Sequence, residues 1–489
     1  ELIKKYKVGN IILFARNYND PKQLFILNQN LQKLAIETTN IPMFISIDQE
    51  GGMVTRIKNK ATFFPGAMTI TATDNPNNAY LVGKIMGKEL VSLGINMNLA
   101  PSLDVNNNPY NPVIGVRSYS DDPNKVSVFG NQFIKGLQEN VIATAKHFPG
   151  HGDTNVDSHL DLPKINKTMK QIEEFELIPF KSAINNGIKA IMSSHINFPI
   201  LNQDGLPVTL SKQFLTDYLR NRLNFNGLIL TDCMQMKAIQ RYYTTKKGSL
   251  MAINAGANII AISHDKHLQI EAIDYIKQSL NDGLITLDTI DERVKRVLEF
   301  KKNNIVLNLN TTYDDVKSII EDTSSKEFTL SIVKDAITLV KGEEYRIGQK
   351  SLLIASEPLQ TTIADEASGD FSIISSIIQN KLNIDTYKIS VEPTTEETTE
   401  ILEKITKYDN VVFCSYNANI YRLQLELIKL IQEKKKLYCI AMRNPYDLTF
   451  LPSIENLVLA YEYTPLSIKA VVEYLKGNLS LKGKVPVKL

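Results

Sequence analysis

The densest group of side chains able to do chemistry lies between residues 146 and 159. From Lys146 the chain reads Lys-His-Phe-Pro-Gly-His-Gly-Asp-Thr, and Asp157 and His159 follow shortly afterwards. An imidazole titrates near neutral pH, so it can give up a proton and take one back. An aspartate two residues before a histidine in an irregular loop can lie beside it and fix its tautomer. The segment therefore indicates acid–base catalysis.

Two other interpretations of this segment stay open. Clusters of histidine and aspartate bind zinc, but the sequence has neither a His-Glu-x-x-His motif nor paired cysteines. Its Pro-Gly and Gly-Asp steps are typical of a loop rather than of a helix that bears ligands, so we predict no metal site and no cofactor. The remaining interpretation is a loop-capping Asp157 beside a surface His159, without catalytic chemistry.

Further polar residues follow short apolar runs. Asp48 ends one such run, Lys146 and His147 end another, and His195 and Asp232 end the next two. In a parallel barrel the residues at the carboxyl ends of the strands surround the active site. Isolated solvated loop residues would show no preference for positions after apolar runs, so we expect these side chains to share one rim.

The apolar runs predict the elements that position this rim. They are rich in Val and Ile, are too short for buried helices, and alternate with stretches of helical periodicity, as β/α units do. Strands buried on both faces form a parallel sheet, and the number of runs approaches the eight strands of a (β/α)8 TIM-like barrel. An open doubly wound sheet is the alternative. The predicted strands are 8–14, 43–48, 95–99, 141–147, 190–195, 227–232 and 257–263.

The chain begins at Glu1, inside an amphipathic segment, rather than at a methionine. We expect that upstream sequence has been removed and that the first strand of the barrel, and any secretion signal, lay there. The barrel is therefore predicted with its first strand truncated.

A second β/α series follows a polar stretch rich in Asn and Thr, which is typical of a domain junction. We predict a catalytic barrel domain over 1–305, a linker over 306–326 and a doubly wound α/β sandwich domain over 327–489. The second series contains no Gly-rich phosphate loop and no cluster of titratable residues, so we expect a structural or positioning role for it. Its predicted strands are 336–340, 351–356, 384–390, 410–415, 436–442 and 457–461.

Composition excludes several classes of protein. A chain of 489 residues exceeds the size of one hydrophobic core, which favours two domains. The formal net charge of +2 makes nucleic acid an unexpected partner. The apolar runs fall short of the about 20 residues that span a bilayer. The 3 cysteines are too few for a disulfide framework, so we expect free thiols.

Several motifs resemble those of one enzyme family. The segment from Lys146 to His159 resembles the signature of the two-domain β-N-acetylglucosaminidases (β-hexosaminidases) of glycoside hydrolase family 3. The resemblance extends over nearly the whole chain. Met53, Cys233 and Asn258 depart from the family pattern without touching the reacting atoms. The other matching segments are 47–52 with Arg56, 111–118, 230–236, 444–447 and 460–464.

The resemblance also implies roles for individual residues. It implies that Asp232 is the nucleophile and that His159, oriented by Asp157, is the general acid/base. For His195 a place in the core is an equal alternative to a place in the site. The residues that would bind sugar hydroxyl or acetamide oxygens are Asp48, Arg117, Lys146, His147 and His195.

We therefore expect an exo-acting retaining β-N-acetylglucosaminidase. It would release terminal β-linked N-acetylglucosamine from peptidoglycan-derived or chitin-type saccharides through a covalent glycosyl-enzyme intermediate. The chain has 0 Trp, which favours a pocket for one terminal sugar over a long aromatic platform. The alternatives are a phosphorylase on the same fold, a β-glucosidase, and a non-catalytic wall-sugar-binding protein. The expected partner is a small saccharide or muropeptide, and the cell envelope or the exterior is preferred over the cytoplasm as the location.

Overall fold

The computed structural model describes the chain apart from residues 156, 203, 347–349, 357–370, 450 and 452. Its N-terminal part is built on a six-stranded sheet whose neighbouring strands follow in chain order and run parallel. Each strand overlaps one of the predicted apolar runs, which confirms a parallel α/β fold. The strands are β1 (Asn10–Leu13), β2 (Phe44–Ile47), β3 (Met97–Asn98), β4 (Ile142–Phe148), β5 (Ala190–Ser193) and β6 (Leu228–Thr231).

The predicted strand over 257–263 is wrong. This segment lies along β6 but forms only one bridge, between Leu230 and Ile259. The hydroxyl of Thr231 accepts a hydrogen bond from the N–H of Ala261, so a side chain replaces the next backbone bond of the ladder. No ladder joins the segment to β1 in the part of the chain that the structure describes. The sheet is therefore a parallel half-barrel, and the barrel of eight strands is incomplete.

Helices surround this sheet, and local sequence signals begin several of them. Helices α1, α3 and α4 each start with an Asp or Asn whose side chain accepts a backbone N–H, followed at once by a proline. Both features favour the first turn of a helix. The helices of this part are α1 (Pro21–Thr39), α2 (Ala67–Ala72), α3 (Pro76–Ser92), α4 (Pro123–Leu137), α5 (Met169–Glu174), α6 (Leu177–Asn185), a π-helix (Gln213–Arg222), α7 (Lys237–Tyr243), α8 (Thr245–Ala255), α9 (Lys266–Asn281) and α10 (Leu287–Asn304).

Helices α3 and α4 pack against each other at glycines. A Cβ on Gly136 would lie 2.1 Å from the backbone oxygen of Tyr80, and a Cβ on Gly83 would lie 2.4 Å from that of Phe133. Backbone atoms inside a packed helix have little room to move. The two glycines therefore permit a close approach that no other residue allows.

We expect Gly136→Ala to lower the free energy of unfolding by about 1–3 kcal/mol, because overpacking against backbone outweighs the better helix propensity of alanine. Calorimetric thermal unfolding measures the change. The control is Val128→Ala on the exposed face of the same helix, where Val128 is 50% exposed and the change should stay within about 0.5 kcal/mol. A Gly136→Ala protein as stable as the parent would contradict the packing argument.

The C-terminal part is built on a second six-stranded sheet, in the order β7-β12-β11-β10-β8-β9. Strand β7 is antiparallel to β12, and the other pairs are parallel. Helix α13 contacts α16 while α14 contacts α15. These elements are β7 (Thr338–Lys341), β8 (Ser351–Ser356), β9 (Asp385–Ile389), β10 (Asn410–Ser415), β11 (Lys436–Ala441), β12 (Asn456–Leu459), α13 (Ile373–Gln379), α14 (Thr395–Lys404), α15 (Leu423–Gln432) and α16 (Pro465–Leu475).

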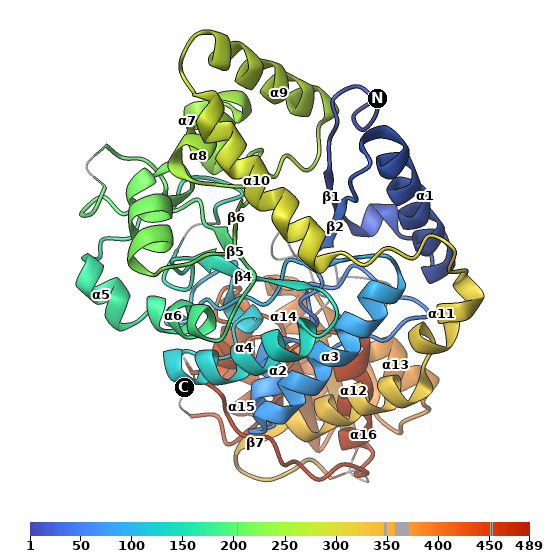
Figure 1. Ribbon diagram of the computed structural model, residues 1–489. Coiled ribbons are helices and arrows are strands. Elements are labelled where there is room, and N and C mark those ends of the chain that lie inside the picture. The colour runs from blue at the N-terminus through green and yellow to red at the C-terminus, as the bar shows by residue number, and fades with distance from the viewer. Residues whose placement is uncertain (156, 203, 347–349, 357–370, 450, 452) are drawn as a thin grey trace.

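The segment expected to be a linker, 306–326, contains structure of its own. It holds helix α11 (Tyr313–Ile320) and the start of α12 (Thr323–Ala336). Tyr313 and Ile320 are buried in the core of the N-terminal part, which explains why a largely polar stretch is helical here. Helix α12 then lies along α2 and α3. Figure 1 shows the orange and red C-terminal part around these helices, with α14 higher and α16 lower in the view.

No helix in the described residues is long and apolar enough to cross a membrane. The 3 cysteines are free thiols, and Cys414 and Cys439 are buried while Cys233 is partly exposed.

Candidate active site

A cavity of about 700 Å³ opens at the carboxyl ends of the barrel strands and continues into the half-barrel. One part of its wall is apolar, with Phe44, Met97 and Leu230 among the residues that face inward. The other part is polar. Of the predicted site residues, those that line the cavity are Asp48, Arg117, Lys146, His147, His159 and Asp232, whereas Asp157 and His195 lie behind the wall.

Asp232 follows β6 directly, so a rigid strand holds it at the cavity. Its Oδ1 accepts a hydrogen bond of 2.7 Å from the N–H of Cys233. Burial raises the pKa of the Asp232 carboxyl, but nearby imidazoles and this N–H outweigh burial and lower the pKa to about 2. The imidazoles belong to His195, His147 and His159. Asp232 is therefore ionised at neutral pH and can act as a nucleophile.

His159 reaches the same cavity from the loop that follows β4. Its Nδ1 lies 2.7 Å from Oδ1 of Asp157, and the same oxygen accepts the backbone N–H of His159 at 2.8 Å. Burial would lower the pKa of His159, but the hydrogen bond and charge of Asp157, with the charge of Asp232, outweigh burial and raise that pKa. The expected aspartate–histidine pair is thus present, and it favours the protonated imidazole.

A group of four charges also lines the cavity. Lys146 Nζ lies 2.6 Å from Oδ1 of Asp48 and 2.7 Å from Oε1 of Glu50. Arg117 donates from Nε and Nη2 to the two oxygens of Glu50, at 2.9 and 2.7 Å. Burial raises the pKa of Glu50, but Arg117 and Lys146 outweigh burial and hold the pKa well below its usual range. Two cations and two anions are therefore held in place beside the cavity before any ligand binds.

Lys146 and His147 are consecutive residues, yet both line the cavity. Side chains normally alternate between the two faces of a strand. The pairing of β4 with β5 shifts register between Ala145 and Phe148, and such irregularities redirect side chains. This local shift brings both residues to the site.

His195 lies behind Asp232 rather than in the cavity wall. It is 0% exposed. Its Nε2 lies 3.1 Å from the carbonyl oxygen of Cys233, and its Nδ1 lies 2.9 Å from the hydroxyl of Thr209. Burial lowers the pKa of His195, and its Nε2 carries hydrogen because the carbonyl oxygen of Cys233 can only accept. His195 therefore supports the chain after Asp232, in agreement with the core alternative rather than with sugar binding.

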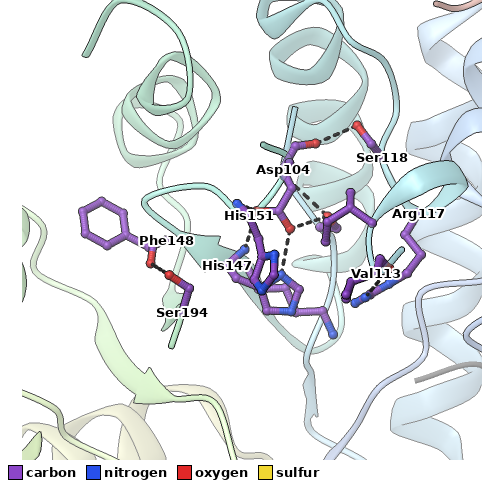
Figure 2. Close-up of polar contacts among 12 residues, drawn as sticks. Asp104, Val113, Arg117, Ser118, His147, Phe148, His151 and Ser194 are labelled. Atoms are coloured by element: carbon purple, nitrogen blue, oxygen red, sulfur yellow. Dashed lines mark hydrogen bonds and ion pairs between the residues drawn. The ribbon is translucent and has the colours of Figure 1, made fainter. Parts of the chain in front are cut away.

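Two carboxylates of this site were not assigned from the sequence. Glu50 belongs to the Asp48-Gln49-Glu50 string that ends a strand, so its position was a usable signal. Asp104 is fully buried and bonded to His147, as Figure 2 shows. A single acid in the largely apolar stretch from Leu99 to Val105 is the signal for it, because buried acids are almost always paired.

The C-terminal part contacts the segments around the site without lining the cavity in the described residues. Of the residues that the structure describes, none beyond Ile276 lines the cavity. Glu462 accepts hydrogen bonds from the N–H of Gly66 and the hydroxyl of Thr69, both at 2.7 Å. The hydroxyl of Tyr446 donates to the carbonyl oxygen of Asn106 at 3.3 Å. These bonds support the expected positioning role of this part.

The fold and the site define a class of enzyme. Cleavage of a glycosidic bond needs a carboxylate on one side of the sugar and a proton donor for the leaving oxygen. Here an ionised Asp232 and a His159 that favours its protonated form line one cavity, and the paired charges of Asp48, Glu50, Arg117 and Lys146 line it as well. A parallel α/β half-barrel with this arrangement at its carboxyl end is typical of a glycoside hydrolase.

Comparison with known proteins agrees. Residues 1–300 match the Glycosyl hydrolase family 3 N terminal domain. The chain therefore belongs to glycosyl hydrolase family 3. It is 38% identical over 305 residues to beta-hexosaminidase A of Pseudoalteromonas piscicida. The aligned region is 58% of this chain and 51%, about half, of that protein. It is 34% identical to a beta-hexosaminidase of Photobacterium profundum, over 60% of this chain and 85% of the other.

A solved structure is similar along the whole chain. A glycoside hydrolase family 3 beta-N-acetylglucosaminidase from Paenibacillus sp. str. FPU-7 is 36% identical, with a TM-score of 0.91, over 100% of this chain and 94% of that one. The similarity confirms the two-part α/β fold.

Proposed function

We propose that the protein is an exo-acting retaining β-N-acetylglucosaminidase that removes terminal N-acetylglucosamine from peptidoglycan-derived or chitin-type saccharides. The observation that carries the proposal is the pairing of His159 with Asp157 in the cavity that Asp232 also lines. The similar beta-hexosaminidases and the similar beta-N-acetylglucosaminidase support the choice of an amino sugar.

In the first step a carboxylate oxygen of Asp232 attacks C1 of the sugar. The bond between C1 and the leaving oxygen breaks, and His159 transfers its proton to that oxygen. Asp157 stabilises the imidazolium before the transfer and keeps the other ring proton on Nδ1, so that Nε2 is the nitrogen that gives up its proton. The products of this step are the free aglycone and a glycosyl ester on Asp232.

In the second step the neutral His159 acts as a base. It takes a proton from a water molecule, whose oxygen attacks C1 while the bond to Asp232 breaks. Two displacements at C1 return the original β configuration. The sugar is held meanwhile by the wall of four charges, where Lys146 and Arg117 offer donors and Asp48 offers an acceptor.

The test compares paired aryl glycosides. We expect the protein to cleave an aryl β-N-acetylglucosaminide with a much higher kcat/KM than the matching aryl β-glucoside, and to release the β-anomer first, as seen by proton NMR. A preference for the plain glucoside would overturn the amino-sugar assignment. Initial release of the α-anomer would overturn retention, and sugar 1-phosphate formed in phosphate buffer would indicate a phosphorylase.

The pH dependence tests the role of Asp157. Since the reactive form has Asp232 ionised and His159 protonated, kcat/KM should fall as pH rises through the raised pKa of His159. We expect Asp157→Asn to move this basic limb to lower pH, because the neutral amide no longer supports the imidazolium. The pH profile of kcat/KM measures the shift.

The matched control is Asp153→Asn, four residues earlier in the same loop. Asp153 lies outside the described cavity wall and pairs with Lys167 at 2.6 Å. This variant loses the same charge but should leave the basic limb in place. Equal shifts in both variants would show that a general charge effect, and not the pair, sets the profile.

A further inference from the structure

Asp104 is a carboxylate that a substrate cannot touch, since it is 0% exposed. Its Oδ1 accepts the backbone N–H groups of His147 and His151, at 3.1 and 2.7 Å. Its Oδ2 lies 2.7 Å from Nδ1 of His147 and accepts the hydroxyl of Ser102 at 2.9 Å. Figure 2 shows Asp104 at the centre of these bonds. Burial raises the pKa of Asp104, but His147 and His151 outweigh it and lower the pKa to about 2.

We propose that Asp104 is a positioning residue that keeps a proton on Nδ1 of His147, so that in the neutral form of the ring Nε2 is the nitrogen that accepts a hydrogen bond from the sugar. An ionised carboxylate only accepts hydrogen bonds, so the facing nitrogen must carry hydrogen. In the neutral ring the other nitrogen then holds the lone pair. His147 lines the cavity. The inference rests on the sugar-binding role of His147 in the proposed function.

The backbone around this pair is fixed as well. The hydroxyl of Ser118 donates to the carbonyl oxygen of Asp104 at 2.6 Å, which ties the acid to the residue after Arg117. Gly152 lies against Val105, the residue that follows Asp104. A Cβ on Gly152 would lie 1.7 Å from the carbonyl oxygen of Val105. The end of β4 with the loop that follows it, and the segment that carries Arg117, are therefore held against each other at Asp104.

Asp104→Asn changes which nitrogen of the His147 ring carries the proton, but it keeps the backbone hydrogen bonds that anchor His147 and His151. An amide nitrogen in the place of Oδ1 would face two N–H donors, so the amide oxygen must take that place and keep both backbone bonds. The NH2 group then faces Nδ1 of His147, which must accept, and the ring proton moves to Nε2. Ser102 can turn its hydroxyl to accept from the same NH2 group. The substitution therefore exchanges the donor and acceptor nitrogens of the His147 ring and keeps the backbone hydrogen bonds of the loop.

The first measurement needs no substrate. Long-range 1H–15N correlation of 15N-histidine-labelled protein reports which ring nitrogen carries hydrogen, and His147→Gln assigns the signal. We expect protonation at Nδ1 in the parent and in the control Ser102→Ala, which keeps the charge, and at Nε2 in Asp104→Asn. An unchanged tautomer in Asp104→Asn would overturn the proposal even if the enzyme proved inactive on every amino sugar.

The second measurement is a double-mutant cycle on an aryl β-N-acetylglucosaminide. We expect Asp104→Asn to lower kcat/KM by about 10- to 100-fold, the size known for carboxylates that orient metal-bound histidines. The same substitution should have almost no effect on the His147→Gln protein, because Asp104 acts through the ring. An equal loss in both backgrounds would show that Asp104 is merely structural and would also overturn the proposal.

Discussion

Asp232→Asn is expected to lower kcat by at least about 10⁴-fold on any β-N-acetylglucosaminide, because the amide cannot form the glycosyl ester. The asparagine oxygen can still accept the N–H of Cys233, so the turn after β6 should be preserved. Steady-state kinetics gives kcat, and mass spectrometry of the parent protein treated with a slow fluorinated amino-sugar substrate should find the label on Asp232.

Binding provides the control for this variant. The wall of four charges, Asp48, Glu50, Arg117 and Lys146, is held together by its own ion pairs. N-acetylglucosamine should therefore bind to Asp232→Asn within about tenfold of its affinity for the parent. Calorimetric titration measures this affinity. Turnover that survives the substitution in a correctly folded protein would remove Asp232 from the mechanism.

The second large effect concerns His159 and depends on the leaving group. A sugar leaving group needs a proton as the bond breaks, so we expect His159→Ala to lower kcat/KM on a β-linked amino-sugar disaccharide by about 10²–10⁴-fold. A dinitrophenyl group leaves without a proton, so kcat/KM on that glycoside should change little. Water still needs a base in the second step, so the glycosyl ester on Asp232 should accumulate and give a burst of released phenol.

A matched histidine shows whether the effect is specific. His267 lies in the first turn of α9 and outside the described cavity wall, so His267→Ala should behave as the parent on both substrates. Stopped-flow measurement of the dinitrophenyl substrate resolves the burst. A loss in His159→Ala that is equal for the two leaving groups would mean that the histidine binds or supports the substrate without moving a proton.

The roles of Asp232 and His159 stay predictions until these experiments are done, but their placement could be anticipated. Asp232 comes directly after an apolar run, and parallel strands of a barrel bring their carboxyl ends to one rim. Asp157 and His159 are two residues apart in a loop, so their contact is a local event. Positions of this kind follow from the order of residues along the chain, and the observed strands and cavity agree with them.

The segment 257–263 and the expected linker show where pattern alone fails. An apolar run looks the same whether its backbone bonds form a ladder or are interrupted by a hydroxyl, as they are at Thr231. The stretch 306–326 looks polar, yet Tyr313 and Ile320 find apolar partners far away in sequence and the stretch becomes helical. Tertiary packing overrides local preference in both segments.

The sequence by itself determined the kind of fold, the rim where polar residues gather and the types of side chain available there. Only the tertiary structure decided how those side chains are paired: that Glu50 joins Lys146 to Arg117, that His195 turns behind the wall, and that a buried Asp104 holds His147. The reason is physical. The charge of a side chain and the tautomer of a histidine depend on burial and on partners tens of residues away. The local spacing of residues in the sequence therefore does not predict them.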